Sequence, residues 1–394
     1  MKRSISLFSF LSLLLLLAAC NAPVSTPEAL AEPATSLPEI ATAIPATPAP
    51  AEINAPLVQS PELIKIEFLN PRDGWGVTKT QIVRTNDGGI TWYDVTPPEM
   101  SEAGYSVDWF IMDNDHVWLQ LADNANYPFA GFQYRTTDGG VTWSEIDTPY
   151  SGAHISFLDP NNGWALADLG VGAGSNAVAV YQTTDGGATW TQKFINDPNQ
   201  TNASESLPLG GLKGGLVPLD MQTAWIYGVI YAPGTPYIFR TDDGGATWSN
   251  VTLPLPTGAE NAEVGIEQMS VVSANVVFLK MRALSDSSNL VIYVSNDGGD
   301  TWSLTPTLIP GGGDADFLSD GEMIVYNREQ FYVTHDAART WSIIPPDIKF
   351  GDSFSGMDFV TTNIGYVISS NSDTNHTSLY RTDDGGATWF PVIP

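Results

Sequence analysis

One short motif, Thr-x-Asp-Gly-Gly-x-Thr-Trp, constrains the fold of this 394-residue chain more than any other feature. It recurs seven times, as in TDDGGATW at residues 241–248, and successive aspartates lie 39 to 58 residues apart. That period is typical of the four-stranded blades of a β-propeller. The sequence therefore predicts an all-β fold, a seven-bladed β-propeller of four-stranded antiparallel blades. The repeated aspartates are Asp87, Asp138, Asp185, Asp243, Asp297, Asp336 and Asp384.

Each copy of the motif predicts a hairpin turn. The aspartate can accept hydrogen bonds from backbone amides two residues on, and Asp-Gly and Gly-Gly permit positive φ angles. The tryptophan that follows is expected to be buried between sheets. In the sixth copy Ala337 and Ala338 replace both glycines, so the geometry of that turn is left open.

The motif resembles the Asp box, S/T-x-D-x-G-x-T-W, of the bacterial neuraminidase repeat family. In that family the box is a structural turn distant from the ligand site. The resemblance therefore implies a structural role for the seven aspartates.

A longer pattern, F-x-n-p-x-x-G-W followed by a strand and R-T-T-D-G-G-x-T-W, is similar to the photosystem II stability/assembly factor family over residues 64–394. The resemblance implies a non-enzymatic propeller that binds a nascent reaction-centre polypeptide through a basic patch. This chain has 16 Lys and Arg against 44 Asp and Glu, so no such patch can be assembled. We therefore expect the fold and a binding role, without the photosynthetic partner.

The N-terminus reads as an export signal. Lys2 and Arg3 precede an apolar run over residues 5–17, which is short for a membrane span. Leu-Ala-Ala-Cys20 resembles the bacterial lipobox, which implies lipidation of Cys20; an ordinary signal peptide with a chance cysteine is the alternative. Because Cys20 is the single cysteine, the domain can hold no disulfide.

These features divide the chain into a signal peptide (1–19), a lipidated Cys20 with a Pro/Ala/Thr-rich disordered linker (20–60) and the propeller (61–394). We expect an exported protein, anchored by lipid to the outer face of the cell membrane or in the outer membrane or periplasm. The first repeat begins with its inner strand and the last ends with its outer strand. The sequence leaves open whether residues 56–59 add an outer strand at ring closure.

A ligand site is expected on the face opposite the Asp boxes, where loop lengths vary between repeats. The longer loops converge on one sector, and the expected partner there is a protein, a peptide or a glycan. Idle solvated loops are the alternative. The candidate contacts are Tyr127, Phe129, Tyr231, Arg282 and Asp286.

A second constellation lies on the inner strands, where an acid precedes an aromatic residue or occupies the equivalent position in four repeats. These acids border the expected central channel, where they can attract a cation or supply paired carboxylates for sugar hydrolysis. We favour hydrated channel groups over either role. They are Glu67, Asp108, Asp316 and Asp358.

Several function classes are disfavoured. A sialidase needs an arginine cluster, but four of the arginines directly precede an Asp box, and a net charge of −28 repels anionic substrates and nucleic acid. Four histidines lack metal-ligand spacing, so we assign no metal, cofactor or catalytic residue. We therefore predict a monomeric, lipid-anchored, non-enzymatic binding or assembly module. A glycoside hydrolase, xyloglucanase-like before sialidase-like, is the alternative.

Overall fold

The computed structural model describes residues 53–98, 100, 103–104, 107–122, 127–284, 288–371, 373–374 and 376–393. All belong to one compact unit, residues 50–394. The expected signal peptide, Cys20 and the linker up to residue 52 lie outside the described residues, as does Asp286. Within the described ranges, no helix has the length and apolar character needed to cross a membrane.

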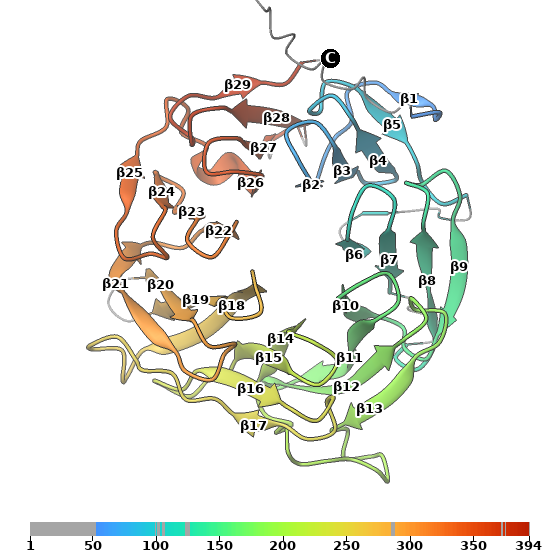
Figure 1. Cartoon of the computed structure of the whole chain (residues 1–394), viewed down its shortest axis with the longest axis vertical. Helices are drawn as coiled ribbons and strands as arrows, with labels where there is room; N and C mark the ends of the chain where they lie inside the picture. Colours follow the sequence, from blue (N-terminus) through green and yellow to red (C-terminus); the bar gives the residue numbers. More distant parts are fainter. Residues whose placement is uncertain are drawn as a thin grey trace, which may run out of the picture. The chain divides into compact units, whose positions relative to one another are not determined.

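Antiparallel strands follow one another from a central axis outward in each repeat (Figure 1). The first three repeats consist of β2 (Lys65–Phe68), β3 (Gly74–Val77), β4 (Ile82–Thr85) and β5 (Trp92–Asp94); β6 (Val107–Ile111), β7 (Val117–Leu121), β8 (Gly131–Thr136) and β9 (Ser144–Thr148); and β10 (Ala153–Phe157), β11 (Gly163–Gly172), β12 (Ser175–Thr183) and β13 (Thr191–Ile195).

The next two repeats consist of β14 (Leu212–Pro218), β15 (Ala224–Val229), β16 (Tyr237–Thr241) and β17 (Ser249–Asn250); and β18 (Glu263–Val271), β19 (Val277–Leu284), β20 (Ser288–Ser295) and β21 (Ser303–Pro310). The last two consist of β22 (Asp314–Phe317), β23 (Met323–Tyr326), β24 (Phe331–Thr334) and β25 (Ser342–Ile344); and β26 (Phe354–Phe359), β27 (Gly365–Asn371), β28 (His376–Thr382) and β29 (Phe390–Pro391).

Hydrogen bonds group these strands into six sheets, which corrects the expectation of seven separate blades. Five sheets are separate blades of four or five strands, and the sixth has eight strands. The fourth and fifth repeats share that sheet because β15 pairs with β18 at Val229 and Gly265. β18 is nine residues long, and its first residues reach the end of β15. The all-β propeller of antiparallel blades is confirmed.

The first repeat has an added outer strand, and side-chain contacts join it to the last repeat. β1 (Leu57–Val58) pairs with β5 as a fifth, outer strand, so the range expected as linker overlaps the first blade. The last sheet is formed by its own four strands, β26 to β29. Across the seam the rings of Phe68 and Tyr366 stack with their centroids 3.6 Å apart, and the Tyr366 hydroxyl donates to the Pro71 carbonyl at 2.9 Å.

The Asp-box turns have one geometry throughout. In the fourth copy, Asp243 accepts hydrogen bonds from the Thr247 amide at 2.9 Å, the Thr247 hydroxyl at 2.7 Å and the Thr241 hydroxyl at 2.8 Å. The amide bound by the aspartate is therefore four residues on, not two as expected. The same contacts recur in the other six copies.

The sixth box keeps this geometry without glycine. Ala337 and Ala338 have φ angles of 58° and 62°, in the same left-handed region as the glycines of the other boxes. Most other residues avoid this region because Cβ approaches the carbonyl oxygen. The hydrogen bonds of the box therefore hold two alanines in a conformation that glycine adopts at lower cost.

Arginines before the boxes brace neighbouring repeats. The Arg84 guanidinium lies 5.5 Å from the ring centroid of the buried Trp75 and donates to the Gly139 carbonyl of the next box at 3.1 Å. Arg135 and Arg240 repeat the stacking on Trp118 and Trp225. These arginines are therefore committed to packing between repeats.

Candidate functional site

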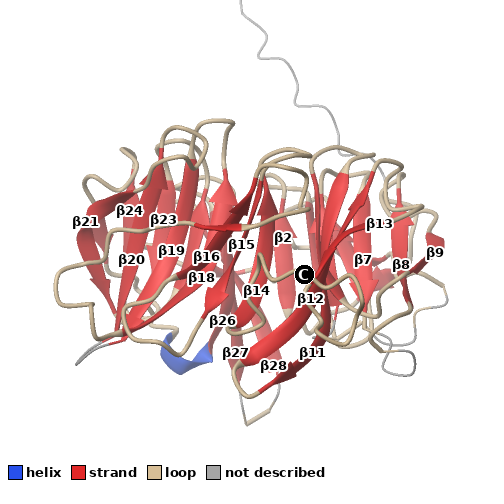
Figure 2. Cartoon of the chain, turned by 90° about the horizontal axis from the view of Figure 1, so that it is seen from below, coloured by secondary structure: helices blue, strands red, loops and turns tan. Residues whose placement is uncertain are grey.

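Two faces of the ring can be distinguished by their connections. The Asp boxes join the third strand of each repeat to the fourth, so they share one face. The connections between second and third strands lie on the opposite face, together with the 3₁₀ helix η1 (Gly351–Ser353) between β25 and β26. That face forms the lower edge of Figure 2, where η1 is drawn in blue.

Three of the four inner-strand acids connect neighbouring repeats. Asp316 accepts the Phe359 amide at 2.9 Å, Asp108 accepts the Ile155 amide at 3.2 Å, and Asp358 accepts the Phe68 amide. In each case the carboxylate on one innermost strand binds the backbone of the next. The occurrence of these acids at equivalent positions in different repeats therefore has a structural explanation.

The pKa values of three of these acids are raised above their ordinary range. Burial, together with the Asp358 charge, raises the pKa of Glu67 to about 8, and burial raises that of Asp358 to about 7. Burial and the Asp358 charge also raise the pKa of Asp316. We expected hydrated channel groups from the sequence; these three acids are half-buried and have raised pKa values. Within the described ranges, no group of three or more His, Cys, Asp and Glu residues is arranged to hold a metal.

The predicted aromatic contacts Tyr127 and Tyr231 meet at one hairpin. The Tyr127 hydroxyl lies 3.9 Å from the position that a Cβ would take at Gly170, and Tyr231 Cδ2 lies 3.0 Å from that position at Gly174. Gly170 and Gly174 belong to the tip of the β11–β12 hairpin. Tyr127 of the second repeat therefore lies near Gly170, and Tyr231 of the fourth repeat lies near Gly174.

This region exposes apolar side chains to an unusual degree. The exposed fractions are 45% for Tyr127, 57% for Phe129, 69% for Val171 and 64% for Tyr231. We call these four residues the hairpin patch. Large exposed apolar groups that cluster on one surface are typical of interaction sites.

A buried lysine that the sequence analysis missed fixes the tip of this hairpin. Lys213 is 6% exposed, and its ammonium donates to the carbonyls of Asn176 at 3.0 Å, Leu209 at 2.7 Å and Gly211 at 3.1 Å. Burial lowers the pKa of Lys213 to about 8. A single lysine within a glycine-rich stretch carries no signal of this role in the sequence.

Arg282 is held elsewhere. Its Nε atom lies 2.7 Å from Glu267 Oε1, and Lys280 Nζ lies 3.5 Å from the other oxygen of the same carboxylate. These contacts place Arg282 in the fifth repeat, and none of its described contacts is with the hairpin patch. The structure therefore brings together Tyr127 and Tyr231, but not Arg282.

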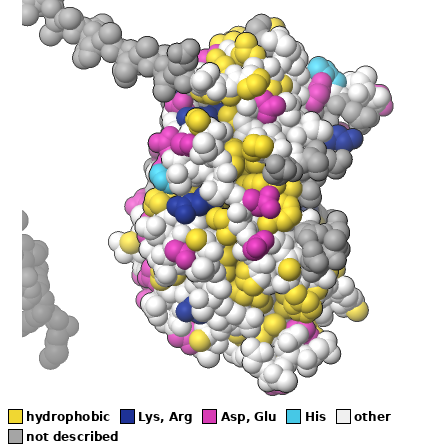
Figure 3. All heavy atoms as spheres, turned by 90° about the vertical axis from the view of Figure 1, so that its right-hand side faces the viewer, with side chains coloured by type: hydrophobic (Ala, Val, Ile, Leu, Met, Phe, Trp, Pro, Cys, Tyr) yellow, Lys and Arg dark blue, Asp and Glu magenta, His cyan; other side chains and the backbone are white. Residues whose placement is uncertain are grey.

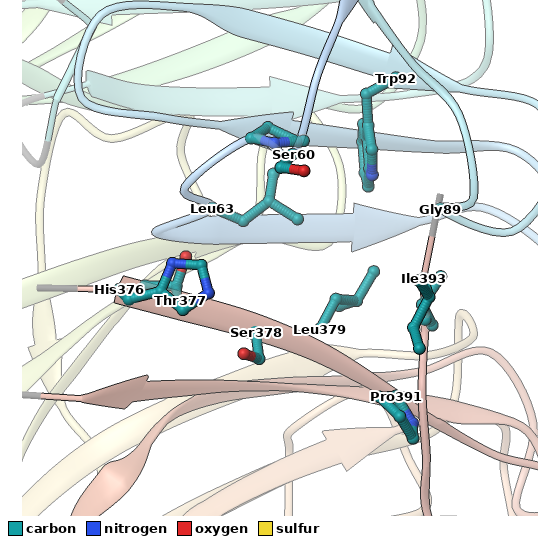
Figure 4. A pocket seen from close by; sticks show the side chains of 12 residues that line it. Ser60, Leu63, Gly89, Trp92, His376, Thr377, Ser378, Leu379, Pro391 and Ile393 are labelled. Carbon is teal, nitrogen blue, oxygen red and sulfur yellow. The ribbon is translucent and has the colours of Figure 1, made fainter. Parts of the chain in front are cut away.

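A cavity also lies where the first and last repeats meet. A cavity of about 180 Å³ lies between the first and last repeats, with Leu63 and Trp92 on one side and Leu379 and Ile393 on the other (Figure 4). Its apolar lining continues the packing that closes the ring. The side of the unit that carries β8 and β9 shows hydrophobic patches among scattered acids and few basic groups (Figure 3).

Comparison with known proteins supports the fold. The model of the BNR/Asp-box repeat family matches residues 293–304, which contain the fifth box. None of the curated proteins matches. Among solved structures, "YCF48 bound to D1 peptide" is 16% identical with a TM-score of 0.52, and the likeness covers 85% of this chain and 99% of that one.

Two carbohydrate-active enzymes are also similar. A PL25 ulvan lyase bound to a sugar is 10% identical with a TM-score of 0.51, covering 86% of this chain and 97% of that one. A GH74 enzyme of Niastella koreensis is 15% identical with a TM-score of 0.35, covering 85% of this chain and 62% of that one. At these identities the comparisons show a β-propeller fold alone.

Proposed function

We propose that this chain is a non-enzymatic binding or assembly module and that its ligand docks on the hairpin patch. The observation that carries the proposal is that exposed Tyr127 and Tyr231 both lie at the β11–β12 hairpin, on the face opposite the Asp boxes. Tyrosines supply large contact areas and a polar group, and they are enriched among residues that dominate binding energy. The similar fold of YCF48, solved with a D1 peptide, supports a binding role for such a propeller.

A glycoside hydrolase is the second candidate. The raised pKa values of Glu67 and Asp358, about 8 and about 7, suit a general acid. A hydrolase also needs a second, ionised carboxylate about 5 to 9.5 Å from the acid. Asp358 and Asp316 accept hydrogen bonds from backbone amides of neighbouring repeats. These contacts favour a structural role for the two carboxylates over a catalytic one.

We also propose a seven-bladed count and a lipid anchor. This count is supported by the two complete sets of four strands in the eight-stranded sheet, β14–β17 and β18–β21, which are joined at one residue pair. The lipobox-like sequence before Cys20 supports an exported protein held at a membrane by its lipid. Cys20→Ser is expected to release the protein from membranes; unchanged membrane fractionation would contradict the anchor.

The experiment that separates the two functions uses the purified chain on glycan and peptide arrays and in hydrolysis assays. A binding module captures a ligand without turnover, and Tyr231→Ala weakens that binding by about 1–3 kcal/mol. Phe390→Ala is the matched control, because Phe390 is 60% exposed on β29 of the last repeat. Turnover of a glycan that Asp316→Asn or Asp358→Asn abolishes would establish the hydrolase instead.

A further inference from the structure

We propose that the ligand of the hairpin patch is a neutral oligosaccharide, and that one end of it binds a polar cluster on the neighbouring strands. This inference rests on the proposed function and specifies its ligand. The cluster consists of Lys65, Asp108, His154 and Tyr227, and we call it the inner-strand cluster.

Three repeats contribute its charged groups. Asp108 Oδ2, on β6, lies 3.4 Å from His154 Nδ1 on β10, and the Lys65 ammonium on β2 donates to the carbonyl of Val107, next to Asp108. The His154 side chain is 59% exposed, so its ring is open to solvent while its Nδ1 atom faces Asp108. The Asp108 hydrogen bond, the largest effect, raises the pKa of His154 against the opposing effect of burial.

The fourth repeat adds Tyr227. Its hydroxyl lies 2.6 Å from the position that a Cβ would take at Gly215, so the phenol can lie against β14, the innermost strand, because Gly215 has no side chain. β14 in turn lies beside β10, the strand that carries His154. Burial raises the pKa of Tyr227, and the Asp108 charge raises it further.

Asp168 connects the inner-strand cluster to the hairpin patch. It lies on β11, and its Oδ1 atom accepts the Gly170 amide at 3.1 Å. Its charge contributes to the raised pKa of His154, after the larger effects of the Asp108 hydrogen bond, burial and the Asp108 charge. It contributes likewise to the raised pKa of Tyr127, after burial. The Asp168 amide also donates to the Gly152 carbonyl at 3.3 Å, and β11 pairs with β10, which carries His154, so Asp168 lies beside both groups. A single extended ligand can therefore contact both.

The chemistry of these groups selects the ligand class. An ammonium, an imidazole and the three phenols of Tyr127, Tyr227 and Tyr231 donate hydrogen bonds, and the carboxylates of Asp108 and Asp168 accept them. Sugar hydroxyls both donate and accept, and the C–H faces of sugar rings pack against aromatic side chains such as Tyr127 and Tyr231.

The local balance of charge argues against a charged ligand. The carboxylates of Asp108 and Asp168 lie near the Lys65 ammonium and the His154 imidazole. The positive and negative groups therefore balance, and neither a basic peptide nor an anionic sugar would have an unpaired opposite charge to bind. The net charge of −28 would attract basic partners over long range, and a basic peptide is therefore the competing outcome.

The test uses the full-length chain in detergent, with a panel of neutral gluco-, galacto- and manno-oligosaccharides and a panel of basic peptides. We expect capture of a neutral oligosaccharide, with affinity reduced at least tenfold by His154→Gln and by Tyr227→Phe. His335→Gln is the control, because the His335 side chain is 60% exposed and lies 3.1 Å from Glu322 in the sixth repeat. Melting temperatures establish that each variant is folded.

Capture of a basic peptide and of no oligosaccharide would overturn the inference. If Tyr231→Ala then abolished binding of that peptide, the proposed function would still hold. Oligosaccharide binding that His154→Gln and Tyr227→Phe leave unchanged would also overturn the inference. Capture of neither class would contradict both proposals.

Discussion

At the scale of single residues, the Asp box is a local hydrogen-bonded unit whose aspartate binds its own turn. The motif spacing was sufficient to predict a turn with positive φ, but not which amide the aspartate binds. That choice depends on the left-handed pair of residues, which brings the amide four positions on, as in Thr247, next to the carboxylate. The box therefore stabilises the fold and uses three of the roughly four acceptor sites of its aspartate within the turn.

The sixth box provides a test of this geometry. Ala337 has a φ of 58°, which costs an alanine about 1 kcal/mol relative to glycine. We expect Ala337→Gly to raise the free energy of unfolding by about 0.5–1 kcal/mol, measured by urea denaturation. Ala338→Gly should gain less, because its fully buried methyl group contributes about 0.8 kcal/mol. A lower stability of Ala337→Gly would show that the turn has another geometry in solution.

At the scale of elements, the β11–β12 hairpin organises the candidate site. The sequence predicted long loops and a shared sector, and Tyr127 and Tyr231 do meet there. It did not predict Lys213, because a cage of carbonyls forms only when the segment Leu209–Gly211 lies beside Asn176 in the folded chain.

Gly174 should be essential to the placement of Tyr231. It has a φ of 76°, and the Tyr231 ring lies 3.0 Å from the position of a Cβ at this residue. We expect Gly174→Ala to lower the free energy of unfolding by about 1 kcal/mol and to weaken ligand binding. Gly172→Ala is the matched control on the same hairpin, since a Cβ there meets no atom within 4 Å. Equal effects of the two substitutions on binding would contradict this role.

At the scale of the whole molecule, the strand pattern was predictable because each repeat encodes its own turns and apolar alternation. The joining of the fourth and fifth repeats was not, since the Val229–Gly265 pair depends on how far β15 and β18 extend. The raised pKa of Glu67 was also unpredictable, because its burial and its proximity to Asp358 arise only when the ring closes.

Ring closure predicts a distinct pH dependence of stability. The pKa of Glu67 rises from 4.5 to about 8 on folding, so its contribution to stability is present below pH 4.5 and is lost as the pH rises through about 8. We expect Glu67→Gln to flatten this decline and to exceed the wild type by about 1–3 kcal/mol at pH 9. Urea denaturation at pH 5 and pH 9 checks this, with the exposed Glu145→Gln as control. If the free energy of unfolding of Glu67→Gln fell as steeply as that of the wild type, the pH dependence would arise from other groups.

Hydrogen–deuterium exchange with the ligand identified on the arrays tests the central claim most directly. The account predicts slower exchange at residues 127–133, 168–176 and 230–232, which carry the hairpin patch, and unchanged exchange in the Asp-box turns on the opposite face. Protection confined to the Asp-box turns, with none at the hairpin, would contradict the claim that this hairpin is the binding site.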